Sequence, residues 1–528
     1  MNFLDLLFIS ERRASYHRAI ENTRPGAAAD AEGGAHRRIA RELGTERGGF
    51  LFGALGRDAD PVRLPDDAAL ASALVIGASG SGKTRFILNL LQSAIERSLL
   101  PSADPLPVEL ELVDPKQETF DLLSQYLAAL WLAADAETRE RIASAVRVID
   151  WSRDAVTPVA PFDNAAGEVS NTYLSFLRTD VAIQAGEHSY SGALRQAFFM
   201  FACVLVERRF PPNYRFAMRF LDDESYRRRI LEGVPDGDVR AFFSEAKHSL
   251  PKQTRDALLR RIQSDMSFPE VRLSVGIPPA DLDRLLPRRA TPIVLGNYGS
   301  SMTLPLAKGK ERASYRLIDI LLSAPRRDQR RRGLLVIDES PMLLSEENEL
   351  TAALMEGART LRSAGMGVLF AAQDFANALP SQIVRTLMLN TRWWAVFQSR
   401  EEAEWIYPHI VRLPSNASEA ERHREFVRTV QNLRRQHFYL YVKGHSALPL
   451  RAPDVGDPAL RSAAELRTIF RREIASRSTI AARTAADLIA RWEAKVVDQA
   501  SVLPAPKQTK AHSPRGIDQL MKDLGLGK

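Results

Sequence analysis

Eight consecutive residues in the first fifth of the chain are suited to holding a phosphate group. They read Gly77-Ala78-Ser79-Gly80-Ser81-Gly82-Lys83-Thr84 and match the pattern G-x-x-x-x-G-K-[ST] in full. The glycines let successive backbone N–H groups point at one anion, and the helix expected after them adds its positive N-terminal end. Lys83 has the reach for the β- and γ-phosphates of ATP, and the Thr84 hydroxyl is a ligand for Mg²⁺. The segment therefore predicts binding of ATP with Mg²⁺.

A pair of carboxylates elsewhere in the chain is suited to completing this site. Asp338 and Glu339 follow the apolar run Leu334–Ile337, which is typical of a buried strand. Asp338 would hold the Mg²⁺ shell, and Glu339 would be the general base that polarises the attacking water. Taken alone, the pair is as well explained by two solvated acids at a strand end. Beside Lys83 and Thr84, catalysis is the favoured interpretation.

A glutamine ends a third apolar run. Val368–Ala372 reads as a strand, and Gln373 follows it directly. A glutamine in this place could contact the γ-phosphate or the lytic water and report hydrolysis to the rest of the fold. A polar residue that simply leaves the sheet is an equal alternative, and the sequence leaves both open.

These side chains need a sheet to position them, and the chain has the pattern of one. From about residue 48, short aliphatic runs alternate with longer helical patterns. The predicted strands are 74–76, 109–113, 146–149, 292–295, 334–337, 367–372, 394–397 and 438–442. Continuous apolar strands between helices are typical of a parallel sheet covered on both faces. We therefore predict an α/β fold with a doubly wound, mostly parallel sheet.

The strand pattern stops between residues 167 and 286, where helical patterns such as 192–208 and 254–266 take over. This interval predicts an inserted all-α subdomain that divides the nucleotide-binding domain into residues 48–166 and 287–455. The other predicted segments are a helical or flexible N-terminal segment (1–47, with a connector over 22–35), C-terminal helices (456–502), and a linker with a short tail peptide (503–528).

The tail peptide has one apolar face if it is helical. Ile517, Leu520, Met521 and Leu524 are spaced i, i+3, i+4 and i+7. So short a helix is marginal in isolation. We expect it to dock on a neighbouring subunit or a partner protein.

Composition is that of an ordinary soluble protein. Of 528 residues, 45% are hydrophobic and 26% charged, and 72 Lys and Arg against 65 Asp and Glu give a net charge of +7. This excess permits nucleic-acid binding without demonstrating it. A single cysteine, Cys203, excludes an internal disulfide. No stretch approaches the ~20 apolar residues of a membrane span, so a cytoplasmic location is expected.

Four motifs together resemble those of a known superfamily. They are GASGSGKT at Gly77, VDPKQE at Val113, LLVIDE at Leu334 and RSAGMGVLFAAQ at Arg362. The chain resembles the FtsK/HerA superfamily, and within it most the type IV coupling proteins of conjugative transfer, the TraG/TraD class. The resemblance implies a RecA-like P-loop NTPase that pumps DNA as a hexameric ring.

The resemblance also implies roles for residues. The phosphate loop, Asp338, Glu339 and Gln373 carry over as the ATPase site. Arg362 matches a family arginine before the glutamine strand and is the first candidate for an arginine finger acting across a subunit boundary. Arg359, Arg392 and Arg400 are further candidates, although an ordinary surface arginine is the simpler interpretation of any one of them.

Two departures from the family pattern keep other functions open. The family's DPKG is DPKQ here, with Gln117 in the glycine position, and the membrane helices that usually begin coupling proteins are lacking. The alternatives are a soluble HerA-like motor in DNA processing or phage defence, a protein-secretion ATPase, and a nucleotide-gated scaffold. A relaxase, a secretion channel or a nuclease would be the partner, in the cytoplasm or peripherally at the inner membrane.

DNA would be bound through its backbone, independently of sequence. Arginine clusters that could serve are 208–209, 227–229, 260–261, 288–289, 326–327, 330–332 and 434–435. Solvated helix faces explain most of these clusters equally well.

Overall fold

The structure of the chain is a computed structural model. It describes residues 30–44, 48–55, 60–100, 108–150, 155–157, 196–197, 200–201, 203–204, 214–244, 252–266, 272–273, 293–297, 332–342, 344, 366–375, 377–399, 401–409, 418–454 and 461–499. The chain divides into two units. The first comprises Met1–Val148, Ala290–Tyr298 and Arg327–Arg477, and the second comprises Ile149–Arg289, Gly299–Arg326 and Ser478–Lys528.

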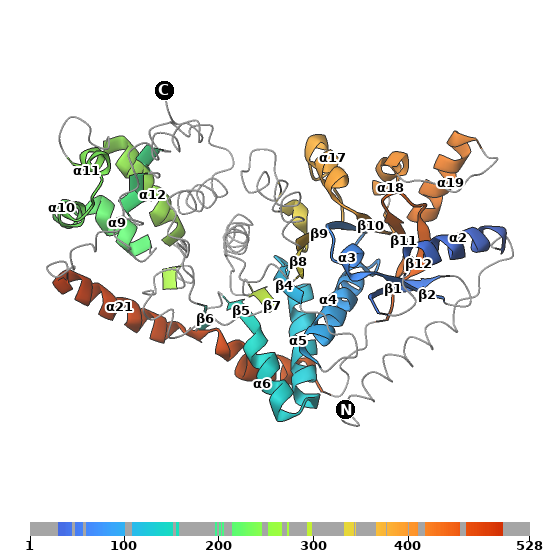
Figure 1. The fold of residues 1–528 in the computed structure, drawn as a ribbon, viewed down its shortest axis with the longest axis horizontal. Helices are drawn as coiled ribbons and strands as arrows, with labels where there is room; N and C mark the ends of the chain where they lie inside the picture. Colours follow the sequence, from blue (N-terminus) through green and yellow to red (C-terminus); the bar gives the residue numbers. More distant parts are fainter. Residues whose placement is uncertain are drawn as a thin grey trace. The chain divides into compact units, whose positions relative to one another are not determined.

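The first unit is built on an eleven-stranded sheet of order β2-β1-β12-β11-β10-β3-β9-β8-β4-β7-β5 (Figure 1). The strands are β1 (Phe50–Leu55), β2 (Asp60–Leu64), β3 (Ala73–Ile76), β4 (Val108–Val113), β5 (Val146–Asp150), β7 (Ile293–Asn297), β8 (Arg332–Ile337), β9 (Met366–Ala372), β10 (Trp393–Phe397), β11 (His437–Val442) and β12 (Leu448–Arg451). All eight strands predicted from the sequence are present.

The centre of the sheet is parallel and its β2 side is antiparallel. The neighbouring strands from β10 through β3, β9, β8 and β4 to β7 pair parallel with one another. β11, β12, β1 and β2 are joined antiparallel at the β10 side. The predicted mixed α/β fold with a mostly parallel sheet is therefore confirmed. Strands β1, β2 and β12 of its antiparallel extension were not predicted. β2 (DPVRL) and β12 (LPLR) are short and contain proline and charged residues, and Gly53 interrupts the apolar run of β1 (FLFGAL).

Helices of the first unit pack along the sheet and beyond its strand ends. They are α2 (Asp30–Leu43), α3 (Asp66–Ala69), α4 (Lys83–Leu99), α5 (Glu118–Ala133), α6 (Ala136–Ala145), α17 (Ser381–Asn390), α18 (Glu402–Ile406), α19 (Glu419–Gln431) and α20 (Ala463–Ile469). α20 continues into the π-helix η4 (Phe470–Ile474) and the 3-10 turn η5 (Ala475–Arg477). α4 lies beside α5 and packs on β1 and β4 (Figure 1).

An aromatic cluster fixes α4 against the sheet. The buried Phe86 ring of α4 lies 5.6 Å from the ring of Phe52, 6.2 Å from Trp393, 5.7 Å from Phe397 and 5.0 Å from Phe438, measured between centroids. Edge-to-face aromatic pairs of this kind add to the stabilisation from burial. The start of α4, where the phosphate loop ends, is thereby held in place relative to β1, β10 and β11.

The flexible connector predicted over residues 22–35 is wrong in its last six residues, because α2 begins at Asp30. Two apolar residues of α2, Ile39 and Leu43, are buried in the core at helical spacing. This burial stabilises a helix whose Gly/Ala-rich first half has no strong propensity of its own.

The second unit is mainly helical where it is described. Its helices are α9 (Tyr214–Asp222), α10 (Glu224–Glu232), α11 (Gly237–Phe243), α12 (Lys252–Met266) and α21 (Ala482–Gln499), with one small sheet of β6 (Ala155–Val156) and β13 (Ile480–Ala481). The Phe220 ring packs between the rings of Phe201 and Phe243, with centroids 5.5 and 5.0 Å away. α12 confirms the predicted helix over 254–266. In the described part of the chain, no helix combines the length and apolarity that crossing a bilayer requires.

Candidate nucleotide site

The phosphate loop joins β3 to α4, and its glycines are required by its geometry. Gly80 and Gly82 have φ of +77° and +111°, in the region that glycine adopts without steric cost. A Cβ on Gly77 would lie 2.6 Å from the Phe397 Cβ and 2.7 Å from the Ser81 Oγ. A larger residue at Gly77 would therefore displace the loop from β10.

Some backbone groups of the loop are hydrogen-bonded to the surrounding chain, and other N–H groups of the loop have no described partner. The N–H groups of Gly77 and Ala78 donate to the carbonyls of Ala372 and Gln398, at 3.2 and 2.8 Å. The Ser81 carbonyl accepts from the Gln436 N–H at 2.7 Å. The N–H groups of Gly80, Gly82, Lys83 and Thr84 donate to no acceptor in the part of the chain that the structure describes. These amides form a concave set of donors suited to a phosphate.

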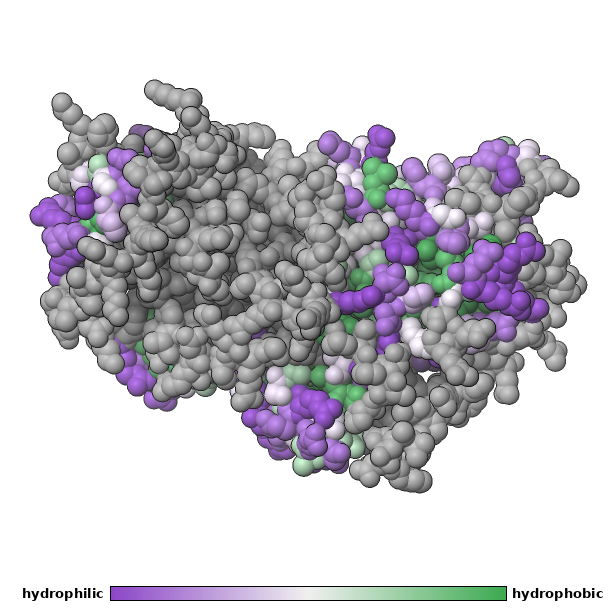
Figure 2. Space-filling model, in the orientation of Figure 1, coloured by the Kyte–Doolittle hydropathy of each residue, from purple (hydrophilic) through white to green (hydrophobic). Residues whose placement is uncertain are grey.

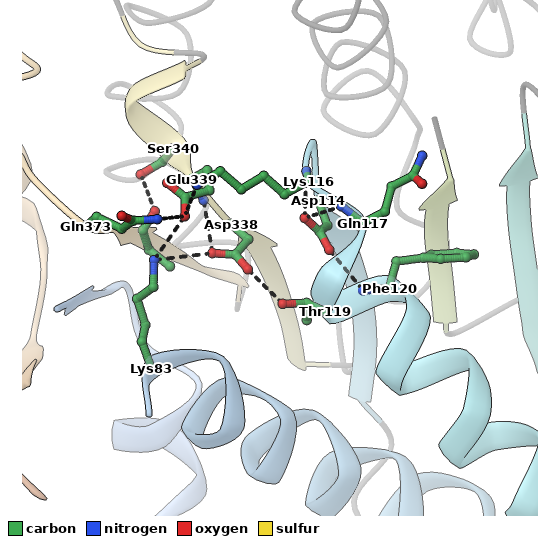
Figure 3. Close-up of polar contacts among 11 residues, drawn as sticks. Lys83, Asp114, Lys116, Gln117, Thr119, Phe120, Asp338, Glu339, Ser340 and Gln373 are labelled. Atoms are coloured by element: carbon green, nitrogen blue, oxygen red, sulfur yellow. Dashed lines mark hydrogen bonds and ion pairs between the residues drawn. The ribbon is translucent and has the colours of Figure 1, made fainter. Parts of the chain in front are cut away.

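The structure brings Lys83 together with both acids that the sequence singled out (Figure 3). The Lys83 Nζ lies 3.4 Å from the Glu339 Oε1 and 3.8 Å from the Asp338 Oδ1, and the side chain is 6% exposed. Sheet order explains the meeting, because β9 separates β3 from β8 by one strand and all three strands end at the same edge. A buried lysine paired with two carboxylates is a strongly polarised site at the ligand-binding edge of an α/β sheet.

Asp338 is oriented from both sides. Its Oδ2 accepts a 2.7 Å hydrogen bond from the hydroxyl of Thr119, which is fully buried in the first turn of α5. Its Oδ1 accepts from the Glu339 N–H at 3.0 Å and faces Lys83. Sequence reasoning missed Thr119, because a lone threonine at a helix start reads as an ordinary first-turn residue. An oriented carboxylate is what a metal ligand requires.

Glu339 has a constrained backbone and a crowded side chain. Its φ is +50°, and its Oε1 accepts from the Lys116 Nζ at 2.8 Å and from the Gln373 Nε2 at 2.9 Å, with Lys83 at 3.4 Å. Burial raises the pKa of Glu339, but Lys83, Lys116 and Gln373 together bring the pKa below its ordinary value. Glu339 is therefore an ionised carboxylate at neutral pH.

Gln373 projects into the site from the end of β9 and hydrogen-bonds the predicted general base. Of the two interpretations that the sequence left open, this contact favours the functional one. Thr84 lies half-buried in the first turn of α4.

Asp114 shapes the turn that follows β4. The side chain is fully buried and accepts hydrogen bonds from the N–H groups of Lys116, Gln117 and Phe120 at 2.9–3.0 Å. Burial, with a further contribution from the negative charge of Asp338, raises the pKa of Asp114 to about 7. Gln117, in the family's glycine position, adopts φ of +67°. The turn thus keeps the glycine-type conformation with a side chain present.

Three non-glycine residues of the described chain have positive φ, and all three border this site. They are Gln117, Glu339 and Gln436, the last against the phosphate loop. Conformations of this kind are sustained where the surrounding structure imposes them, commonly at functional sites.

The residues present fit ATP and Mg²⁺. The Ser81 Oγ is buried without a hydrogen-bond partner among the described residues, in the same loop as the four N–H groups that have no described acceptor. Mg²⁺ usually takes one or two carboxylates and completes its shell with water and phosphate oxygens. For such a shell, Asp338 would offer a carboxylate and Thr84 a hydroxyl from this chain.

The predicted arginine finger lies outside the description. Arg359, Arg362 and Arg400 are not among the described residues. Arg392 precedes β10, at the end of the strand remote from the phosphate loop, where its side chain lies 3.9 Å from Asp67. Within its own chain, Arg392 therefore does not reach the nucleotide site.

Comparison with known proteins agrees with this geometry. Residues 47–155 match the FtsK/SpoIIIE family. The matched segment contains the phosphate loop and the β4–α5 turn, so the likeness to the FtsK/HerA superfamily predicted from the motifs is confirmed. No curated protein matches the chain at a significant level.

Solved structures show the same fold over most of the chain. A bacterial conjugative coupling protein, TrwBdeltaN70 in an unbound form, matches with a TM-score of 0.51 at 15% identity, covering 81% of this chain and 93% of that chain. TrwB in complex with ADP and Mg²⁺ matches with a TM-score of 0.51 at 14% identity, covering 81% and 94%. VirB4 of Thermoanaerobacter pseudethanolicus matches with 0.50 at 16%, covering 79% and 99%. The predicted RecA-like P-loop fold is confirmed.

Proposed function

We propose that this protein is an ATP-hydrolysing motor that moves DNA, of the conjugative coupling type, to or through a type IV secretion apparatus. One observation carries the ATPase part. Lys83, the Asp338–Glu339 pair and Gln373 come from three separate segments and converge beside a loop in which four amides have no described acceptor.

In the proposed reaction each group has a task. The free amides and Lys83 bind and orient the β- and γ-phosphates, and Asp338 with Thr84 holds the metal shell. Mg²⁺, when bound, neutralises charge on the phosphate oxygens. The Glu339 carboxylate, ionised and held at the γ-phosphate end by Gln373, takes the proton of the attacking water. Water oxygen forms the new bond to the γ-phosphorus, and ADP leaves with the electron pair of the broken bond.

Similarity of fold to the TrwB coupling protein supports DNA as the cargo. So does the net positive charge of the chain. Arginines 37, 38 and 41 of α2 are exposed, and Figure 2 shows a strongly hydrophilic surface over α2. The Arg227–Arg229 cluster contributes less, because Arg227 is buried and donates to the carbonyls of Phe220 and Leu221. We further propose a hexameric ring in which a neighbouring copy supplies the arginine finger, at a cytoplasmic location.

The test is ATP hydrolysis by the full chain with and without unrelated double- and single-stranded DNA, at several salt concentrations. We expect DNA to raise turnover and its affinity to fall steeply with salt, by ~10³–10⁵ between 50 and 200 mM if six to ten phosphates are contacted. ATP turnover without measurable DNA binding at low salt would refute DNA as the cargo and favour the alternative of a protein-secretion ATPase.

A further inference from the structure

Lys116 is the side chain closest to the general base of the proposed reaction. Its Nζ lies 2.8 Å from the Glu339 Oε1, closer than the Lys83 Nζ at 3.4 Å. Figure 3 shows Lys116 reaching across from the β4–α5 turn to Glu339, so the base is contacted by lysines from two different segments. The phosphate loop and the acidic pair do not account for this second lysine.

The backbone that presents Lys116 is held rigidly. Asp114 accepts the N–H groups of Lys116 and Gln117, Pro115 is buried, and Gln117 takes the left-handed conformation at the start of α5. The Lys116 side chain itself is 45% exposed. A partly exposed ion pair is weak. Lys116, with its backbone fixed and its ammonium group accessible to solvent, is therefore suited to exchanging one anionic partner for another.

The charges of the cluster balance only without nucleotide. Lys83 and Lys116 face Asp338 and Glu339, two cations against two anions. Among the described residues, Glu339 is the one acid that Lys116 contacts. A triphosphate bound in the loop brings further negative charge close to the Lys83 Nζ. Since both ammonium groups contact the same carboxylate oxygen, Lys116 is within reach of the same terminal phosphate.

We propose that Lys116 is a positioning residue that holds Glu339 until the γ-phosphate of ATP replaces the carboxylate as its partner. This inference rests on the proposed function, since it assigns Glu339 the role of base. ATP releases the Glu339 carboxylate from Lys116 to face the attacking water. ADP lacks the γ-phosphate and leaves the pair intact, so Lys116 makes the site respond to the presence of that group.

The experiment compares Lys116→Gln, Lys116→Arg and a matched control, Glu118→Gln, in the full chain. Glu118 is an exposed charged residue two positions along the same segment, without a contact to the cluster. For each variant we would measure kcat and the Kd of ATP and of ADP.

We expect Lys116→Gln to lower kcat ~10–100-fold and to weaken ATP binding while leaving the Kd of ADP unchanged, as loss of a charged contact to one phosphate requires. Lys116→Arg should recover most of the ATP preference, and Glu118→Gln should match the wild type.

Two results would overturn the proposal. One is a Lys116→Gln variant with wild-type kcat and ATP-to-ADP preference. The other is a parallel loss of ATP and ADP affinity, which is the mark of a merely structural lysine. Loss of turnover in Lys83→Ala tests the proposed function independently. If the wild type binds ATP without turning it over, the proposed function fails, and the ATP-to-ADP preference of Lys116→Gln still decides the role of Lys116.

Discussion

Replacing Glu339 with glutamine isolates the step that the site is proposed to catalyse. Glutamine has the size of glutamate, and its Oε1 still accepts the hydrogen bonds that now come from Lys116 and Gln373. In this variant the Lys83 Nζ still has the Asp338 Oδ1 as an anionic partner, 3.8 Å away in the structure. The backbone, the phosphate loop and the metal ligands are therefore expected to survive the exchange, and what is lost is the carboxylate that accepts the proton of water.

General-base catalysis contributes ~10²–10⁴-fold to rate. At 1.36 kcal/mol for each factor of ten, that is about 3–5 kcal/mol of transition-state free energy. We expect Glu339→Gln to lose turnover in this range while binding ATP at least as tightly as the wild type, since one negative charge near the triphosphate is gone. Phosphate release and equilibrium ATP binding measure the two quantities. Turnover within about twofold of the wild type, with binding intact, would refute Glu339 as the base.

Three further perturbations test the elements around the site. Thr119→Val should raise the Mg²⁺ concentration needed for half-maximal turnover ~10–100-fold, because Asp338 loses its orienting hydroxyl, and a Mg²⁺ titration checks this. Burial raises the pKa of Asp114 to about 7, so between about pH 4 and 7 the folded chain keeps a proton that the unfolded chain has released. The contribution of this group to the free energy of unfolding therefore falls as pH rises through that window. Asp114→Asn should make the melting temperature depend less on pH over this range, and thermal melts at several pH values check this. Phe86→Ala should lower the free energy of unfolding by ~3–5 kcal/mol, measured by denaturant titration, because it empties the centre of the aromatic cluster.

The central strands of the sheet could be predicted because each of them has a recognisable apolar pattern in its own short segment. Runs such as Leu334–Ile337 are apolar throughout, and the structure buries every residue of this run. The phosphate loop was recognisable for the same reason, since its glycines, Lys83 and Thr84 are contiguous. Because ligands gather at the carboxyl edge of a parallel sheet, Lys83 and the two acids could be expected to meet there. The order of the strands was not predicted from the sequence.

Other parts of the site depend on contacts that no local pattern encodes. Thr119 meets Asp338 across 219 residues of sequence, and Lys116 meets a glutamate more than 200 residues away. Thr119 is unremarkable within its own segment, and the DPKQ motif that contains Lys116 does not show which acid the lysine contacts. The antiparallel strands β1, β2 and β12 are likewise stabilised by pairing with one another and with β11. The short sequences of β2 and β12 contain proline and charged residues, and Gly53 interrupts the apolar run of β1, so none of them gave a clear signal. The roles of the site residues and the domain boundaries 1–47, 48–166, 167–286, 287–455, 456–502 and 503–528 stay predictions.

The most direct test of the account is ATP hydrolysis by Lys83→Ala beside the wild type, with melting curves to compare their folds. Lys83 is the buried cation between the phosphate loop and both acids, and its removal leaves Lys116 to balance Glu339. We predict turnover by the wild type and none measurable in Lys83→Ala, with similar melting temperatures. Equal turnover in the two proteins would show that hydrolysis does not take place at this loop.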